Sequence, residues 1–171
     1  MTRRPPKNKP TNTFTDLLRQ GTRALQQGKI EQSRKLLEKA HRLDSDHPDV
    51  ILNLAGAYIL SKKFKEAAAL LEPLSERDPN NPMIWTNLGA AYLGNPILAK
   101  DEHHQKAIAA FKTAYWLDPQ TPHVAYNLGL IYRDRKENDA AVDWFKRALQ
   151  ANPNDKDAKH YIEQLGTENT D

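Results

Sequence analysis

The sequence predicts an all-α protein built from stacked helical hairpins, and three observations lead to this prediction. A segment of common pattern, with Asn-Leu followed by a small residue and then Tyr, occurs three times: VILNLAGAYIL at 50–60, IWTNLGAAYLG at 84–94 and VAYNLGLIYRD at 124–134. A second common segment follows each of them and ends in Asp-Pro or Asn-Pro, at Pro79, Pro119 and Pro153. Recurring types within both segments are spaced three and four residues apart, which is typical of helices and not of strands. Each unit is therefore expected to be a helix, a short turn and a second helix.

Length and composition are those of one folded domain. The chain has 171 residues, of which 39% are hydrophobic and 27% charged, and one domain usually takes about 100–200 residues. The absence of cysteine excludes a disulfide scaffold, a thiolate zinc site and a cysteine nucleophile. No stretch approaches the roughly 18 apolar residues that a membrane span needs. We therefore expect a cytoplasmic protein, since no secretory signal is recognisable either.

Residues 1–13 are expected to form a basic disordered arm. They contain four basic residues, three prolines and no acid, and such a segment cannot bury enough apolar surface to order itself. The whole chain has a net charge of +3, so without the arm's four positive charges the body carries −1. A nucleic-acid-binding domain should present a basic face. Nucleic acid is therefore an unlikely partner except through residues 1–13, which are either a solvated tail or an electrostatic tether.

Small residues at one position of each predicted first helix indicate close helix packing. They are Gly21, Ala55, Gly89 and Gly129, and a tyrosine follows three residues after the last three of them. Asn81-Pro82 and Thr121-Pro122 have the sequence of an N-cap followed by a first-turn proline. These two pairs are predicted to start the next hairpin in each case.

The units resemble tetratricopeptide repeats (TPR), whose period is about 34 residues. Asn53 and Asn87 are separated by one such period. The third unit has the type that the family prefers at all eight of its characteristic positions: Trp85, Leu88, Gly89, Tyr92, Ala107, Phe111, Ala114 and Pro119. The fourth unit departs once, at Ala125, and the second once, at Leu74, whereas the first unit is degenerate.

The resemblance implies a right-handed α-solenoid of four helix-turn-helix units followed by a C-terminal cap helix. The TPR domain would cover 14–166, with units at 14–47, 48–81, 82–121 and 122–155, a cap helix at 156–166 and a flexible tail at 167–171. The cap is supported by Ala158, Tyr161, Ile162 and Leu165, which form one apolar stripe on a polar helix. Such a helix closes the exposed end of a repeat array.

The third unit carries six extra residues near 95–104, which separate Asn87 from Asn127 by more than one period. Asn95-Pro96 repeats the signature of a helix start. We therefore predict that the second helix of this unit begins near Pro96 or Ile97, with an ordered loop as the alternative. The insertion is either merely tolerated or a contact element for a partner.

No residue pattern predicts catalysis, a cofactor or a metal. His103 and His104 are adjacent, and neighbouring residues on a helix diverge by about 100°, whereas a helical metal pair prefers the i, i+4 spacing. The chain contains neither a phosphate-binding glycine loop nor a nucleophile motif. We accordingly expect no enzyme, with catalytic, cofactor-binding and metal residues all absent.

The resemblance places the binding surface on the concave face, which the first helices of the units line. Asn53, Asn87 and Asn127 occupy one equivalent position and would form a ladder, because amides offer donors and an acceptor to a peptide backbone. At about 0.5–1.5 kcal/mol per hydrogen bond, three amides would contribute roughly 1.5–4.5 kcal/mol. The alternative is that these asparagines support packing or meet water. Apolar walls are expected from Leu18, Leu52, Met83, Tyr126 and Leu130.

Other family members hold a C-terminal carboxylate with basic groove residues. The corresponding positions here carry no lysine or arginine, and only the family's asparagines are kept, so a chaperone-tail receptor is not expected. Read from the first unit, these positions hold Leu18, Thr22, Asn53, Met83 and Asn87. Two tryptophans, Trp116 and Trp144, lie outside the usual core positions. They either pack partly against the next unit or act as binding hot spots. The sequence therefore predicts a non-catalytic adaptor that binds a protein or peptide. The alternatives are a self-associating scaffold that forms a homo-oligomer and an RNA-associated protein recruited by the arm.

Overall fold

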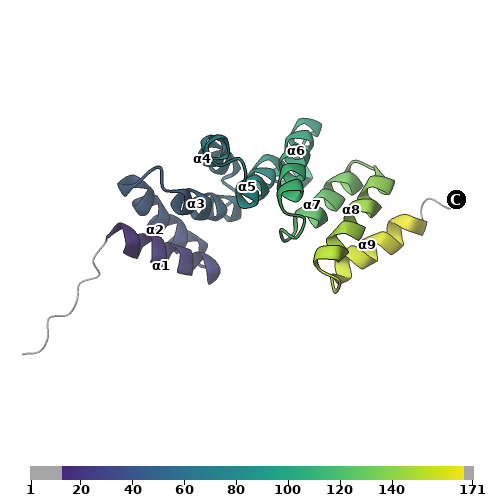
Figure 1. Ribbon diagram of the computed structural model, residues 1–171, viewed down its shortest axis with the longest axis horizontal. Helices are drawn as coiled ribbons and strands as arrows, with labels where there is room; N and C mark the ends of the chain where they lie inside the picture. Colours follow the sequence, from purple (N-terminus) through teal and green to yellow (C-terminus); the bar gives the residue numbers. More distant parts are fainter. Residues whose placement is uncertain (1–12, 168–171) are drawn as a thin grey trace, which may run out of the picture.

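The computed structural model describes residues 13–167, and the helices in this range follow one another along an elongated row (Figure 1). They are α1 (Phe14–Gln26), α2 (Ile30–Leu43), α3 (Pro48–Leu60), α4 (Phe64–Arg77), α5 (Pro82–Leu93), a 3-10 turn η1 (Pro96–Leu98), α6 (Asp101–Leu117), α7 (Val124–Asp134), α8 (Asn138–Ala151) and α9 (Lys156–Thr167). No strand occurs among these residues. The predicted all-α class is therefore confirmed.

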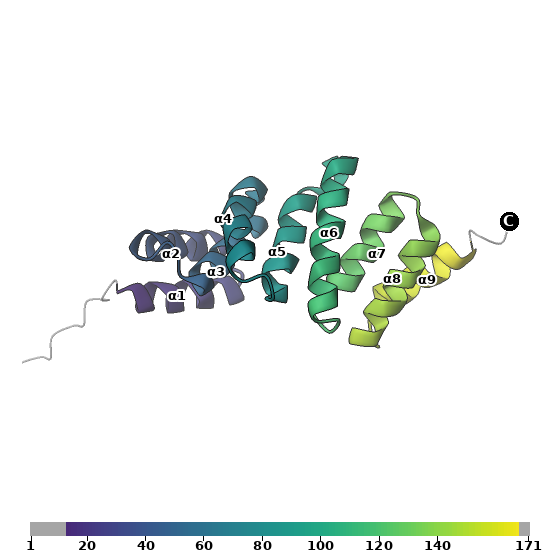
Figure 2. The same ribbon diagram turned by 45° about the horizontal axis from the view of Figure 1, so that its top comes forward.

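Each helix packs against the one before it and the one after it, from α1 to α9 (Figure 2). In addition, α3 lies directly against both α1 and α5. The first three hairpins thus bring their first helices side by side, which is the arrangement of an α-solenoid. No helix within residues 13–167 is long and apolar enough to cross a lipid bilayer.

Close helix contact inside the hairpins depends on glycine. A Cβ atom added to Gly89 would lie 2.7 Å from the ring of Phe111, and one added to Gly129 would lie 2.6 Å from the ring of Phe145. Gly21 is equally close to a leucine of α2, at 2.7 Å. These separations leave no room for a methyl group. The sequence prediction that small residues here permit close approach is therefore confirmed at these three positions.

The two tryptophans outside the usual core positions differ in their surroundings. Trp144 is only 7% exposed. Its ring meets that of Tyr115 edge-on at a centroid distance of 5.1 Å, and Arg147 lies 4.5 Å from its centroid. Trp116 is 69% exposed. Trp144 is thus part of the core between α6 and α8, while Trp116 remains on the surface.

The predicted helix starts are right at one junction and wrong at the other. The Asn81 side chain accepts a hydrogen bond from the Met83 amide at 3.1 Å, as an N-cap should. Thr121 does not cap α7. Its buried hydroxyl instead donates to the Asp118 carboxylate at 3.2 Å, and α7 begins after His123, which adopts a left-handed conformation with φ 65°.

The inserted segment forms a 3-10 turn before α6 begins, so the predicted helix start at Pro96 or Ile97 is wrong. The helix α6 begins only at Asp101, because residues 96–98 close as η1. His103 Nδ1 accepts from the Lys100 amide at 3.0 Å and so caps the new N-terminus. Arg135 holds the first turn from outside through its ion pair with Asp101.

The first helix, α1, begins at Phe14, and its N-cap lies in the segment assigned to the arm. Thr13, which the sequence places in the arm, is the N-cap of α1, and its hydroxyl accepts from the Asp16 amide at 3.3 Å. The rest of the expected arm, residues 1–12, lies outside the described residues, as do residues 168–171 of the expected tail.

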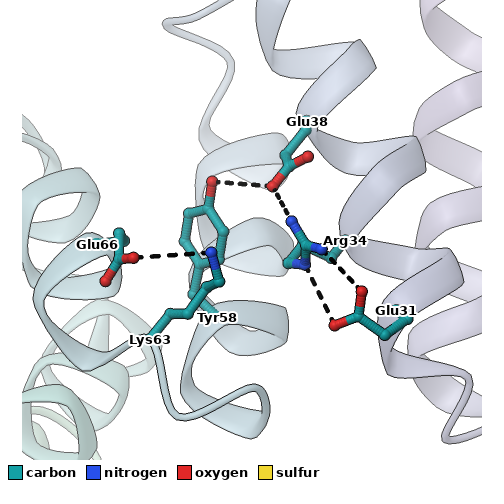
Figure 3. Close-up of polar contacts among 6 residues, drawn as sticks. All are labelled: Glu31, Arg34, Glu38, Tyr58, Lys63 and Glu66. Carbon is teal, nitrogen blue, oxygen red and sulfur yellow. Dashed lines mark hydrogen bonds and ion pairs between the residues drawn. The ribbon is translucent and has the colours of Figure 1, made fainter.

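A tyrosine of each later hairpin reaches back to the hairpin before it. The Tyr58 hydroxyl in α3 donates to the Glu38 carboxylate in α2 at 3.3 Å (Figure 3). Arg34 orients that carboxylate with a hydrogen bond of 2.6 Å and pairs with Glu31 at 2.7 Å. The hydroxyl group therefore links two units through a carboxylate that is already held in place.

The same contact recurs once and is then replaced. Tyr92 donates to Glu72 at 3.0 Å, with the same separation along the sequence as between Tyr58 and Glu38. At the next junction Lys112 stands at the place of the glutamate, and its ammonium group lies 5.6 Å from the centre of the Tyr132 ring. A cation-π contact thus takes the place of a hydrogen bond.

Replacing Tyr92 by phenylalanine is expected to lower the free energy of unfolding by about 0.5–1.5 kcal/mol at neutral pH, the net contribution of one hydrogen bond. Burial, with the Glu72 carboxylate, raises the pKa of the Tyr92 phenol to about 12, against about 10 in an unfolded chain. The folded state thus favours the neutral phenol. Its contribution is fully present below about pH 10 and is lost as the pH rises toward 12.

Urea denaturation of wild type and Tyr92→Phe between pH 7 and 11.5 tests this prediction. The wild type should lose stability more steeply than the variant above about pH 10. Tyr132→Phe is the matched control, because the Tyr132 hydroxyl makes no hydrogen bond within residues 13–167, and it should keep wild-type stability at pH 7. Equal slopes of wild type and Tyr92→Phe above pH 10 would contradict the argument.

Candidate peptide-binding face

The candidate binding residues lie on the first helices, α1, α3, α5 and α7, and none of them is buried. The direct packing of α3 on α1 and α5 places three of these helices side by side. Every predicted binding residue keeps part of its side chain exposed: Leu18, Leu52, Asn53, Met83, Asn87, Tyr126, Asn127 and Leu130. Met83 is the most accessible, at 49%. These residues are hereafter called the ladder face.

The three asparagines of the ladder face are not equivalent. The Asn53 amide nitrogen donates to the Asp49 carbonyl of its own helix at 2.7 Å. Asn87 and Asn127 make no side-chain hydrogen bond within residues 13–167. Two complete amide groups, with the oxygen and the second N–H of the Asn53 amide, are thus available to a ligand, which is fewer than the three complete amides of the sequence argument.

Three leucines of the ladder face are partly buried against the core and partly exposed to solvent. Leu18 packs partly against the clusters between α1, α2 and α3. Leu52 packs against the cluster between α3 and α6, and Leu130 against the C-terminal cluster. This packing fixes the positions of the three side chains, while part of each stays exposed. An apolar ligand would therefore meet pre-positioned side chains and would not have to order them.

An aromatic and cationic group closes the C-terminal end of the ladder face. Tyr126 meets Phe145 edge-on at 5.6 Å and Tyr161 at 6.5 Å. The guanidinium of Arg133 lies 4.7 Å from the centre of the Tyr161 ring and pairs with Asp134 at 2.7 Å. Burial, together with the nearby Tyr161 phenol, raises the pKa of Tyr126.

Sequence reasoning missed the place of Tyr161 in this group, because it treated the residue only as part of an apolar stripe on the cap helix. The signal was available. Tyr161 follows Asn127 by one full period of the repeat. It therefore occupies in α9 the position that the asparagines occupy in the earlier helices.

Charge is sparse on the ladder face. Arg19, one period before Asn53, pairs with Asp16 at 2.8 Å. Arg133 is likewise neutralised by Asp134. The face thus offers amides, apolar side chains and aromatic rings, and no concentrated charge of either sign.

The described residues contain no group of three His, Cys, Asp or Glu side chains that could hold a metal ion. His103 Nδ1 is used as an acceptor by the Lys100 amide. The neighbouring histidine, His104, lies one helix position further, so the pair does not converge on a common point.

Two family models of the tetratricopeptide repeat match the chain, at residues 24–91 and 96–156, and together they span more than half of it. The chain belongs to the tetratricopeptide repeat family. No curated protein sequence matches it.

Solved TPR structures share the fold. A thermophilic TPR protein of Thermus thermophilus superposes with a TM-score of 0.76 at 20% identity, covering 92% of this chain and 84% of its own. MamA from Desulfovibrio magneticus RS-1 gives a TM-score of 0.71 at 21% identity, with 85% and 79% covered. Another MamA crystal structure gives 0.72 at 22% identity, with 90% and 81% covered. At these identities the likeness concerns the fold alone.

Proposed function

We propose that this TPR protein is a non-catalytic adaptor that binds an extended segment of a partner protein on its ladder face. The observation that carries the proposal is the pair of uncommitted amides, Asn87 and Asn127, among apolar side chains that are only partly covered. Membership of the repeat family supports a protein-interaction scaffold in general.

The chemistry of the face suits a peptide backbone. Each asparagine amide can donate to a peptide carbonyl and accept from a peptide N–H. Met83 and Leu130, which flank the two amides in sequence, would cover apolar side chains of the ligand. The absence of concentrated charge favours a segment that is itself largely uncharged.

Asn87→Ala/Asn127→Ala is expected to weaken binding about fivefold to 150-fold, which corresponds to two hydrogen bonds of about 0.5–1.5 kcal/mol each. A displayed library of random peptides would first be selected on the wild type. The dissociation constants of the selected peptides would then be measured by isothermal calorimetry for wild type and variant.

Asn80→Ala/Asn154→Ala is the matched control, since both asparagines are exposed and lie in turns between helices. It should bind the selected peptides as the wild type does. If the ladder variant also binds them at wild-type strength, with unchanged helicity, the ladder face is not the binding surface.

Self-association is a second candidate, which the exposed Trp116 favours. An exposed indole at 69% accessibility is a frequent interface anchor, and Leu117 beside it is 38% exposed. Sedimentation equilibrium of the wild type without peptide separates the two candidates. A mass that rises with concentration would support a homo-oligomer. A constant monomer mass would exclude self-association and leave the adaptor as the remaining candidate.

Recruitment to RNA through the arm concerns residues that lie outside the described part of the chain, and it stays a prediction. So does the cytoplasmic location. Affinity for RNA that falls steeply with salt and disappears when residues 1–12 are removed would support the arm's role.

A further inference from the structure

The inserted segment forms one wall of a cleft between the N-terminal ends of α4 and α6. Its volume is about 330 Å³. The residues that line it come from four elements: Phe64, Lys65 and Ala68 of α4, Ala91, Tyr92 and Leu93 of α5, Gly94, Asn95, Leu98 and Ala99 of the following segment, and Glu102, His103 and Lys106 of α6. This surface, hereafter the insertion cleft, contains none of the ladder-face residues.

The interior of the insertion cleft is mainly apolar. Phe64, Tyr92 and Leu98 supply most of its large side chains, and Leu98 is 72% exposed. Gly94, whose φ is positive at 63°, turns the chain at the edge of the cleft next to the Phe64 ring. The volume is at the lower end of the about 300–1,000 Å³ typical of ligand pockets. It therefore suits one or two large side chains.

The rim of the insertion cleft has a small excess of positive charge. Lys65 stands on the α4 side and makes no ion pair within residues 13–167, while Lys106 stands on the α6 side with His103. The single lining acid, Glu102, is neutralised by Lys106 at 3.1 Å. Its hydrogen bond to Lys106 lowers the pKa of Glu102, and the charges of His103 and Lys100 act in the same direction.

We propose that the insertion cleft binds a leucine or phenylalanine side chain of a partner protein whose neighbouring residues are aspartate or glutamate. The apolar interior takes the anchor, and Lys65, which makes no ion pair within residues 13–167, attracts a flanking carboxylate. The sign of the rim argues against the chain's own N-terminal arm as the occupant, since residues 1–12 carry four basic residues and no acid. This site would act beside the ladder face and does not depend on it.

A fluorescein-labelled peptide Gly-Asp-Glu-Leu-Phe-Glu-Asp is the probe. Two controls keep its length: one has lysine at the acidic positions, and the other has alanine in place of Leu-Phe. In ¹H–¹⁵N correlation spectra of the full chain, the acidic probe should shift the amides of Phe64, Gly94 and Leu98. Fluorescence polarisation should show that the acidic probe binds at least about tenfold more tightly than either control. The lysine control loses the favourable charge at the rim, and the alanine control loses the apolar anchor.

Leu98→Ser and Lys65→Glu/Lys106→Glu should each weaken the acidic probe by at least about tenfold, through lost apolar contact and reversed charge. The matched controls should leave binding unchanged. They are Leu43→Ser, at another exposed leucine, in α2, and Lys39→Glu/Lys146→Glu, on α2 and α8. Asn87→Ala/Asn127→Ala should also bind the probe normally, which separates this site from the proposed function.

Three outcomes would overturn the proposal. One is a lack of cleft shifts at millimolar probe. Another is binding of the basic peptide as tight as that of the acidic one, which would leave an apolar site without charge selection. The third is a mass in sedimentation equilibrium that rises with chain concentration and returns to that of the monomer when the probe is added, which would make the cleft a self-association surface.

Discussion

Replacing Phe111 by alanine is expected to lower the free energy of unfolding by about 3–5 kcal/mol, the usual range for a buried phenylalanine. Phe111 is fully buried in the middle of α6, and its ring touches Gly89 of α5. The Cβ-free backbone of Gly89 offers no side chain that could move into the space of the lost ring. The cavity would therefore stay open, and cavities that cannot collapse are the most costly.

The position of Phe111 adds a second effect. In a repeat array each unit is stabilised by its neighbours, so a weakened central unit uncouples the two ends. Urea denaturation followed by circular dichroism should give a lower midpoint for Phe111→Ala than for the wild type. The substitution should accelerate hydrogen exchange more in α5 and α6 than in α2 or α9. Trp116→Ala is the control, because this aromatic side chain on the same helix is 69% exposed. A loss of stability for Trp116→Ala as large as that for Phe111→Ala would contradict the packing argument.

The period of the sequence was enough to predict the helices and the packing inside the hairpins. A small residue recurs at one position of the first helices and a bulky residue at one position of the second helices, and the two meet where the helices of a hairpin cross. Gly89 with Phe111 and Gly129 with Phe145 do so. Such contacts follow from periodicity, because they repeat and because both partners lie on regular helices.

Features that break the period could not be predicted in the same way. The start of α6 at Asp101 depends on a 3-10 turn, the His103 cap and the ion pair with Arg135, which lies in the next hairpin, just after α7. The start of α7 depends on whether Thr121 bonds forward to its helix or back to Asp118. In both cases two alternative helix starts differ in free energy by about one hydrogen bond. A residue pattern does not show which of the two is more stable.

The candidate sites show the same division. The register placed the ladder-face residues on the first helices, but it could not say that the Asn53 amide would bond its own helix. Burial of Trp144 required the edge-on contact with Tyr115 from another helix. The insertion cleft depends on the path of residues 94–99 relative to α4, which is a tertiary property and has no counterpart in the repeat.

Replacing Gly129 by alanine is expected to lower the free energy of unfolding by about 1–3 kcal/mol, as overpacking of a core does. The new methyl carbon would lie 2.6 Å from the Phe145 ring. That ring is held on its other sides, since it stacks on Tyr161 at 5.0 Å and meets Tyr126 edge-on at 5.6 Å. It cannot move away without disturbing α9, so the usual gain from removing a helical glycine is lost.

Gly56→Ala is the matched control and should act in the opposite direction. The nearest atom to its added methyl group is in Leu25, at 3.7 Å, an ordinary contact. Alanine in the middle of a helix then stabilises by about 0.5–1 kcal/mol relative to glycine. Thermal and urea denaturation of both variants measure the two effects. Equal signs for the two substitutions would mean that helix propensity, and not the contact with the ring, decides the outcome.

The second hairpin suggests how the Gly129→Ala loss can be relieved. At the corresponding positions it has Ala55 and Leu71, both fully buried. Alanine in place of glycine thus occurs together with leucine in place of phenylalanine. Gly129→Ala/Phe145→Leu should therefore be more stable than the sum of the two single changes predicts, with a coupling energy of about 0.5–3 kcal/mol between contacting residues. Strict additivity in this double-mutant cycle would show that the methyl group and the ring do not compete for the same space.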